Sequence, residues 1–334
     1  MAVVNNNLTI SDIAEALNIS KTTVSRAISG KGRIGNETKE KVLKYIEENN
    51  YVPNPMAKGL AQSKTYNICW VTPADSVATE LPFFQRCMMG IADVTGGYNY
   101  DILLSMVYED NINQLKRIIT NKKVDGAILG RTLVNDLSVE FLKKSEIPFV
   151  VIGSTEIKNI TQVDNDHIRA CKELTLILVM KGVKKIALIG GSLNHVVNRT
   201  RRDGFLLGLK EQGVKPDEEL IYVGSDDSIS VERAVDDALR NGAECLVCMD
   251  DGICANVLAK LKKDGVEIPS DIKVASFYNS VVLENSQPAI TTLSYDPKEL
   301  GATACKVLFD KIAGKTVQNK LLLSYDVLLK GSTQ

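Results

Sequence analysis

Apolar positions in the first fifty residues repeat at helical spacing, between polar residues that start and stop helices. Thr9 with Asp12 three residues later is a variant of the capping box, so a helix is expected to begin there and to stop at Asn18. Ser20 then caps a second helix that runs through Ile28. Because the turn between the two helices is short, the pattern predicts a helix-turn-helix.

The second helix separates apolar from polar side chains. Val24, Ala27 and Ile28 share the inward face. The outward face carries residue types that hydrogen-bond base edges and phosphates, namely Lys21, Thr22, Ser25 and Arg26. A third helix is expected from Asn36 to about Asn49, with the core stripe Val42, Leu43 and Ile46. A plain solvated helical bundle remains an alternative on these residues alone.

The segment after residue 50 contains another helix start. Asn54 can serve as N-cap with Pro55 at the first helical position, and only a short helix fits before Ser63. A helix of that length is marginal by itself in water, so it needs a partner. Leu60 would be a free apolar wedge, of the kind that opens base steps in the minor groove.

From Tyr66 the pattern changes to short apolar runs that alternate with amphipathic helices. The runs predicted as buried strands are 68–71, 101–104, 126–129, 149–152, 185–190 and 245–248. Buried strands that alternate with helices predict parallel sheets with right-handed crossovers. Two such sheets fit the length, which predicts a bilobed body hinged near Val163–Asp164 and again near Ser294.

Charge is distributed unevenly along the 334 residues, although the net charge is only −1. Residues 1–64 carry nine basic and six acidic residues, whereas the remainder carries 31 basic and 35 acidic residues. A mildly basic head on an acidic body suits a protein that contacts phosphate with one end only. No long apolar segment and no signal peptide is recognised, so a cytoplasmic protein is expected.

Catalytic chemistry finds little support. The seven cysteines are scattered through apolar runs, and Cys245 and Cys248 fall in a predicted strand, where residues three apart face opposite sides. Only two histidines occur, His167 and His195, and neither a nucleophile elbow nor a metal-ligand spacing is present. Gly190–Gly191 after a strand is no dinucleotide fingerprint. We expect no enzyme, no metal and no cofactor.

Three motifs together resemble the LacI/GalR family of bacterial transcription regulators: residues 9–14, the pattern Ser20-x-x-Thr23-Val24-Ser25-Arg26, and Tyr51–Asn54 followed by Ala57 and Leu60. The resemblance covers almost the whole chain. It implies a small all-α helix-turn-helix headpiece (1–50), a hinge helix and linker (51–65), and an α/β bilobed effector domain of the type I periplasmic-binding-protein fold (66–334). The first lobe is expected at about 66–163 and 294–319, and the second at about 164–293 and 320–334.

By this resemblance the chain is expected to be a cytoplasmic repressor that binds a palindromic operator as a homodimer. The residues implied at the DNA are Ser20, Lys21, Thr22, Thr23, Ser25, Arg26 and Arg33 in the major groove, with Asn54, Ala57 and Leu60 at the minor groove. Ser29 stands where the family usually has Asn. No heptad of leucines follows Leu329, which favours a dimer over a tetramer.

Ligands of parallel sheets bind beyond the carboxyl ends of strands, so effector candidates lie just after the strands. They are Phe83, Phe84, Arg131, His195, Arg201, Asp250, Tyr278 and Asn279. Core packing is the alternative for the two Phe side chains, and an exposed loop is the alternative for His195. Arg201 matches the family's effector-binding arginine, whose fork suits hydroxyls or carboxylates.

Three positions depart from the pattern of a sugar binder. Asp250 stands where many members have Asn, Asn279 replaces the usual acidic residue, and Asp226 replaces an aromatic platform. These departures weaken the case for an ordinary monosaccharide. The effector is expected to be a sugar or another polar metabolite, and a cleft that responds to no small molecule is the alternative. The competing interpretation is a periplasmic solute-binding protein without DNA function. Such a protein would lack the headpiece and would carry a signal peptide.

Overall fold

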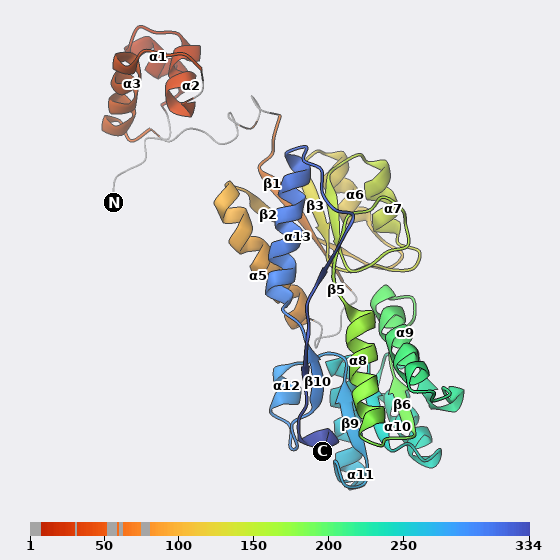
Figure 1. The fold of residues 1–334 in the computed structure, drawn as a ribbon. Helices are drawn as coiled ribbons and strands as arrows, with labels where there is room; N and C mark the ends of the chain where they lie inside the picture. The colour runs from red at the N-terminus through yellow and green to blue at the C-terminus, as the bar shows by residue number, and fades with distance from the viewer. Residues whose placement is uncertain (1–7, 31, 52–58, 60–62, 75–80) are drawn as a thin grey trace. The chain divides into compact units, whose positions relative to one another are not determined.

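The computed structural model describes residues 8–30, 32–51, 59, 63–74 and 81–334. The chain divides into two compact units, Met1–Thr65 and Tyr66–Gln334, which we term the headpiece and the effector domain. The headpiece contains three helices in its described part, α1 Ile10–Ala16, α2 Lys21–Ser29 and α3 Asn36–Glu48. Their bounds confirm the helix-turn-helix expected from the capping pattern (Figure 1).

Local signals fix the headpiece helices. The Thr9 side chain accepts from the Asp12 backbone N–H at 3.3 Å, and the Asp12 carboxylate accepts from the Thr9 N–H at 2.8 Å. Asn18 has the positive φ of 51° that ends α1, as predicted. The core comprises Ile13, Ala14, Val24, Ala27, Val42 and Tyr51. Leu43 was expected in this core, but it is exposed, because Val42 and Ile46 already fill the inward face of α3.

Two six-stranded sheets form the effector domain. The first sheet has the order β11-β5-β4-β3-β1-β2 and is parallel throughout, with bounds β1 Asn67–Pro73, β2 Asp101–Val107, β3 Gly126–Leu129, β4 Phe149–Ile152, β5 Gln162–Asn165 and β11 Lys320–Leu323. The second has the order β12-β10-β9-β8-β6-β7, with β6 Ile186–Ile189, β7 Ile221–Tyr222, β8 Cys245–Cys248, β9 Lys273–Ser276, β10 Thr291–Ser294 and β12 Asp326–Leu328. Only β12 runs antiparallel to its neighbour.

Helices cover both faces of each sheet, as buried parallel strands require (Figure 1). The first lobe has α5 Leu81–Tyr98, α6 Asn113–Thr120, α7 Leu137–Lys144 and α13 Pro297–Ile312. The second lobe has α8 His167–Met180, α9 Val196–Glu211, α10 Ser228–Arg240, α11 Asp251–Asp264 and α12 Val281–Glu284, with the 3₁₀ turns η1 Glu218–Leu220 and η2 Gly331–Thr333. This two-sheet α/β architecture confirms the predicted fold class.

The chain passes between the lobes three times, after β5, β10 and β11. The last passage corrects one expected boundary. Residues 320–323 were assigned to the second lobe, yet β11 pairs with β5 along its whole length in the first sheet. The change of lobe therefore comes after Leu323. None of the described helices is long and apolar enough to cross a membrane.

Close packing of two helices holds the first lobe together. A Cβ atom added at Gly90 of α5 would collide with the backbone of Lys298, and one at Gly301 of α13 would collide with the backbone of Cys87. The two glycines therefore allow α5 and α13 to approach each other at backbone distance. All seven cysteines are free and buried, and burial raises the pKa of the Cys69, Cys245 and Cys305 thiols to about 12.

Candidate nucleic-acid interface and effector cleft

The recognition helix α2 is set by its two ends. Ser20 caps it, with its hydroxyl accepting from the Thr23 N–H at 3.1 Å. Gly30 closes it in the left-handed conformation, φ 67°, and donates its N–H to the Arg26 carbonyl. The cap therefore occupies the Ser20 hydroxyl, and Thr23 lies half-buried beside it at 2.8 Å between the two hydroxyl oxygens.

The remaining predicted DNA contacts form one exposed face. Lys21, Thr22, Ser25 and Arg26 are exposed on α2, and Arg33 is exposed in the loop that follows. The Arg26 side chain runs past Gly32, where an added Cβ would lie 3.2 Å from the Arg26 Nε. Gly32 thus makes room for Arg26 in its position over the end of the helix. Asn54, Ala57 and Leu60 lie outside the described residues.

A cavity of about 400 Å³ lies between the lobes of the effector domain, which is enough for a small metabolite. Residues from both lobes line it, at the carboxyl ends of strands where the topology places ligands. Seven predicted effector residues are among them: Phe83, Phe84, Arg131, His195, Arg201, Asp250 and Tyr278. The eighth, Asn279, is not; its side-chain amide donates to Glu284 at 2.8 Å instead.

Arg201 is the most buried basic group of the cavity, with 7% of its surface exposed. It lies in the second turn of α9, and its guanidinium carbon is 6.0 Å from the ring centre of Tyr278. Its Nε has no hydrogen-bond partner among the residues that the structure describes. Burial of a guanidinium N–H without an acceptor costs free energy. The Nε–H is therefore suited to donate a hydrogen bond to an acceptor atom of a ligand.

The floor of the cavity contains residues that the sequence analysis did not select. His167 and Asp164 are both buried, with the His167 Nε2 3.4 Å from an Asp164 oxygen. The Ser154 hydroxyl donates to the other Asp164 oxygen at 2.8 Å. Among the described residues neither the His167 Nδ1 nor the Asn165 Oδ1 has a partner. A signal was available, because Asp164 and Asn165 end β5 and His167 follows it, at the first passage between the lobes.

The second-lobe wall adds Asn198, Asp226 and Asp251, which were also not selected. Asp226 follows the short strand β7 and accepts from the Ser192 N–H at 2.8 Å. Gly191 permits this approach, since a Cβ there would lie 2.6 Å from the Asp226 oxygen. Burial raises the pKa of Asp251, whereas the nearby Arg201 guanidinium lowers it to a smaller extent.

Contacts across the mouth of the cavity join the lobes. The Val134 N–H donates to the Asn194 carbonyl at 2.9 Å, and the Val196 N–H donates to the Thr132 carbonyl at 3.3 Å. Glu109 of the first lobe accepts from the Asn194 amide at 2.8 Å and lies 3.4 Å from the His195 Nε2. We term this set the interlobe clasp. His195 is thus half-buried between the lobes, rather than in an exposed loop.

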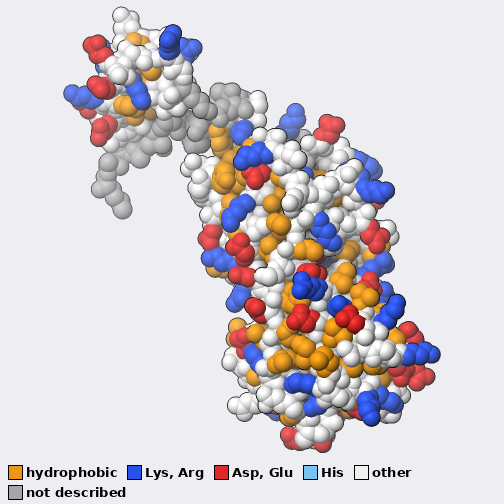
Figure 2. All heavy atoms as spheres, in the orientation of Figure 1, with side chains coloured by type: hydrophobic (Ala, Val, Ile, Leu, Met, Phe, Trp, Pro, Cys, Tyr) orange, Lys and Arg blue, Asp and Glu red, His pale blue; other side chains and the backbone are white. Residues whose placement is uncertain are grey.

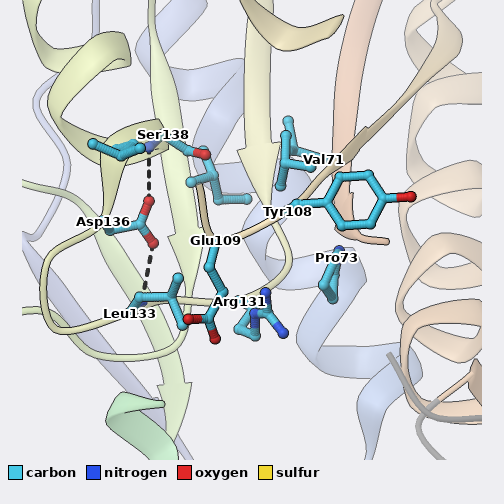
Figure 3. Close-up of a pocket in the computed structure, with 11 residues that line it drawn as sticks. Val71, Pro73, Tyr108, Glu109, Arg131, Leu133, Asp136 and Ser138 are labelled. Atoms are coloured by element: carbon cyan, nitrogen blue, oxygen red, sulfur yellow. Dashed lines mark hydrogen bonds between the residues drawn. The ribbon is translucent and has the colours of Figure 1, made fainter. Parts of the chain in front are cut away.

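A second hollow lies behind the clasp in the first lobe, and Figure 3 shows Glu109, Arg131 and Asp136 around it. Its volume of about 20 Å³ admits little more than one water molecule. Asp136 is occupied as the cap of α7, accepting from the Leu133, Ser138 and Val139 N–H groups. The larger cavity is therefore the candidate effector site.

An exposed polar recognition helix and a separate domain with an interlobe cavity define a DNA-binding transcriptional regulator. Residues 9–54 match the family of bacterial regulatory proteins named lacI, and residues 177–333 match a periplasmic binding protein-like domain. Catabolite control protein A of Staphylococcus epidermidis is 27% identical to this chain, over 98% of this chain and 99% of that protein.

Solved structures agree with this match. The transcription regulator CcpA of Lactococcus lactis is 26% identical with a TM-score of 0.72, over 80% of this chain and 99% of that one. The lac repressor dimer bound to operator and an anti-inducer has a TM-score of 0.81 at 22% identity, over 98% of this chain and 99% of that one. The chain therefore carries a DNA-binding domain of the lacI family of bacterial regulatory proteins, followed by a periplasmic binding protein-like domain. It is a DNA-binding transcriptional regulator of the repressor type, which confirms the resemblance and excludes the solute-binding alternative.

Proposed function

We propose that this regulator is a homodimeric repressor of a palindromic operator, and that a small polar effector in the interlobe cavity controls its affinity for DNA. The observation that carries the proposal is the cavity itself, because both lobes line it and Arg201 reaches it with an unpartnered Nε. A ligand that contacts both lobes stabilises the arrangement of the lobes in which it makes the most contacts. Through the chain, a change of that arrangement reaches the headpiece.

The exposed face of α2 supports the assignment of the DNA contacts. Lys21, Thr22, Ser25 and Arg26 offer cationic and hydroxyl donors to phosphates and base edges. Arg33 extends this face beyond the helix. For Asn54, Ala57 and Leu60 the proposed minor-groove role rests on the sequence pattern alone.

Exposed apolar side chains support a dimer. Leu104 and Met106 on the edge strand β2, and Tyr108 directly after it, are each about half exposed. Met89 and Tyr98 are similarly exposed on the neighbouring α5. Figure 2 shows hydrophobic side chains gathered along the effector domain in this view. An exposed edge strand with apolar side chains is normally covered, and a second copy of the chain supplies a matching surface.

We infer that the interlobe clasp is the part that responds to the effector. Its hydrogen bonds join loops of opposite lobes at the cavity mouth, so opening of the mouth must break them. A ligand that bridges the two walls favours the closed arrangement. The chain acts by binding rather than by catalysis, in the cytoplasm where bacterial DNA lies, and it requires no cofactor.

The experiment is selection of duplex DNA from a random pool by the intact protein, followed by sedimentation of the complex. Two protomers on one duplex with an inverted-repeat consensus are expected, because an isologous dimer reads two equivalent half-sites. One protomer per duplex, or a consensus without inverted symmetry, would contradict the proposal.

A further inference from the structure

The described residues that line the interlobe cavity have an excess of negative charge. Four aspartates, Asp164, Asp226, Asp250 and Asp251, stand against two arginines, Arg131 and Arg201. Three of the aspartates belong to the second lobe, and we term Asp226, Asp250 and Asp251 the carboxylate wall. With neutral histidines, the ligand therefore enters a cavity whose described lining carries a formal charge of −2.

Two side chains of the wall, Asp226 and Asp250, retain capacity for a ligand. One oxygen of Asp226 accepts from the Ser192 N–H, and one oxygen of Asp250 accepts from the Ile253 N–H, both at 2.8 Å. Within the described residues, the second oxygen of each accepts no hydrogen bond from the protein. The two strand ends β7 and β8 flank β6, so both carboxylates lie at the same edge of the second sheet.

Near Arg201 the cavity offers a hydrogen-bond donor instead of an acceptor. The buried Nε of Arg201 is a donor without an acceptor in the described structure. The His167 Nδ1, also in the lining, has no partner there either, and it is an acceptor when the Nε2 proton points to Asp164. Both side chains are only 7% exposed. Burial raises the pKa of the Asp251 carboxyl, and the Arg201 guanidinium only partly offsets this, so we assign no ligand contact to Asp251. Asp226 is exposed and Asp250 is half-buried, and each offers its second oxygen to a ligand in the cavity.

We propose that the cavity takes a compact polyhydroxylated amine, bound as its protonated cation. The ammonium group is held by Asp226 and Asp250, while a hydroxyl oxygen accepts from Arg201. Charge-assisted hydrogen bonds of the ammonium group replace the water that these carboxylates lose when the ligand covers them. An anionic metabolite would instead add charge to a negative cavity. This inference rests on the proposed effector role of the cavity.

The test is calorimetric titration of the intact protein with D-glucosamine, D-glucose and N-acetyl-D-glucosamine at mildly acidic pH. The three sugars share one ring, and only D-glucosamine carries a protonated amine under these conditions. Binding of D-glucosamine is expected to be at least about tenfold tighter than binding of either neutral sugar, as loss of one charged hydrogen bond predicts. Equal or tighter binding of D-glucose, or no binding of D-glucosamine, overturns the inference.

Two variants localise the preference. Asp250→Asn removes one charge yet keeps the cap of α11, because Asn is as good an N-cap as Asp. It should reduce the preference for D-glucosamine over D-glucose about threefold to tenfold. Asp227→Asn is the matched control, since Asp227 caps α10 in the same way but does not line the cavity. An unchanged preference in Asp250→Asn, or an equal loss in Asp227→Asn, overturns the assignment.

Operator binding, measured separately on DNA selected from a random pool, distinguishes this inference from the proposed function. Intact operator binding without amine preference removes only the inference. Amine preference without operator binding removes the proposed repressor role and leaves the ligand class standing.

Discussion

The headpiece and the effector domain each contain an aspartate that serves the start of a helix, with opposite electrostatic results. Hydrogen bonds from the Thr9 side chain and backbone lower the pKa of Asp12, which is exposed on α1. Asp136 accepts from three backbone N–H groups at α7, yet burial raises its pKa. Solvation, rather than the number of hydrogen bonds, decides the direction of the shift.

The same contrast separates the two functional surfaces. The hydrogen-bond donors of α2 are exposed to water. They can bind DNA from an exposed surface, because the high charge density of DNA makes the attraction strong. Three buried polar side chains of the cavity, Asn165, His167 and Arg201, each have an atom without a partner in the described structure, so they suit a ligand of matching chemistry. Recognition by an exposed helix and recognition by a closed cavity therefore respond differently to substitution.

Arg26→Ala should have the largest effect. A base or phosphate contact of this kind contributes about 1–3 kcal/mol, and a dimer loses it at two half-sites, for a total of about 2–6 kcal/mol. Fluorescence anisotropy on the selected operator measures the loss. Lys44→Ala on α3 is the control, because its ammonium group is exposed and near Glu48. If both variants bind the operator like the unmodified protein, α2 is not the recognition helix.

Arg201→Ala should affect the cavity alone. Loss of a charged hydrogen bond costs about 1.5–3 kcal/mol of ligand affinity. A ligand that raises the unfolding temperature of the unmodified protein should therefore no longer do so, while operator affinity stays unchanged. Arg202→Ala is the matched control, since Arg202 pairs with Asp203 and does not line the cavity. Retention of the full thermal shift by Arg201→Ala would remove Arg201 from the effector site.

Much of the headpiece and of the fold could be predicted from sequence, because the signals are local. Capping residues at Thr9 and Ser20 fixed where α1 and α2 begin, and apolar runs marked most buried strands. The α3 stripe was less certain, since Val42 and Leu43 are adjacent and only packing decides which one turns inward.

The cavity was only partly predictable, since residues far apart in sequence form it. Arg131 and Asp250 could be predicted as lining residues, because each comes shortly after a strand. Asp164 and His167 could be assigned to the cavity only once the position of β5 between the lobes was known. Asn279 does not line the cavity, and its side-chain NH2 group donates to Glu284 nearby. The assignment of β11 depended on a strand pairing across about 155 residues, which periodicity alone does not reveal.

Glu109→Gln should have a modest effect on lobe closure. Gln keeps an acceptor for Asn194 but removes the charge that faces His195, and partly exposed ion pairs contribute less than about 1 kcal/mol. Hydrogen exchange at the Val134 amide should accelerate severalfold. Glu140→Gln on α7, exposed and outside the clasp, should leave that rate unchanged. No acceleration in Glu109→Gln would mean that the backbone bonds alone hold the clasp.

The smallest effect concerns pH. Because burial raises the pKa of Asp136 above its ordinary value of 3.8, the folded state keeps this proton to higher pH than the unfolded state. Stability of the effector domain should therefore fall as pH rises from 3.8 through the raised pKa. Asp136→Asn keeps a capping residue and should flatten that part of the profile in urea unfolding. A profile identical to that of the unmodified protein would contradict the assigned shift.

Coupling between operator and cavity is the central claim, and hydrogen exchange of the intact protein with and without its selected operator tests it most directly. The Val134 and Val196 amides are the reporters, because each donates across the cavity mouth to the opposite lobe. The account predicts that operator binding changes their exchange rates severalfold in the unmodified protein and leaves them unchanged in Arg26→Ala. Protection of α2 by operator, with unaltered exchange at both reporters, would contradict it.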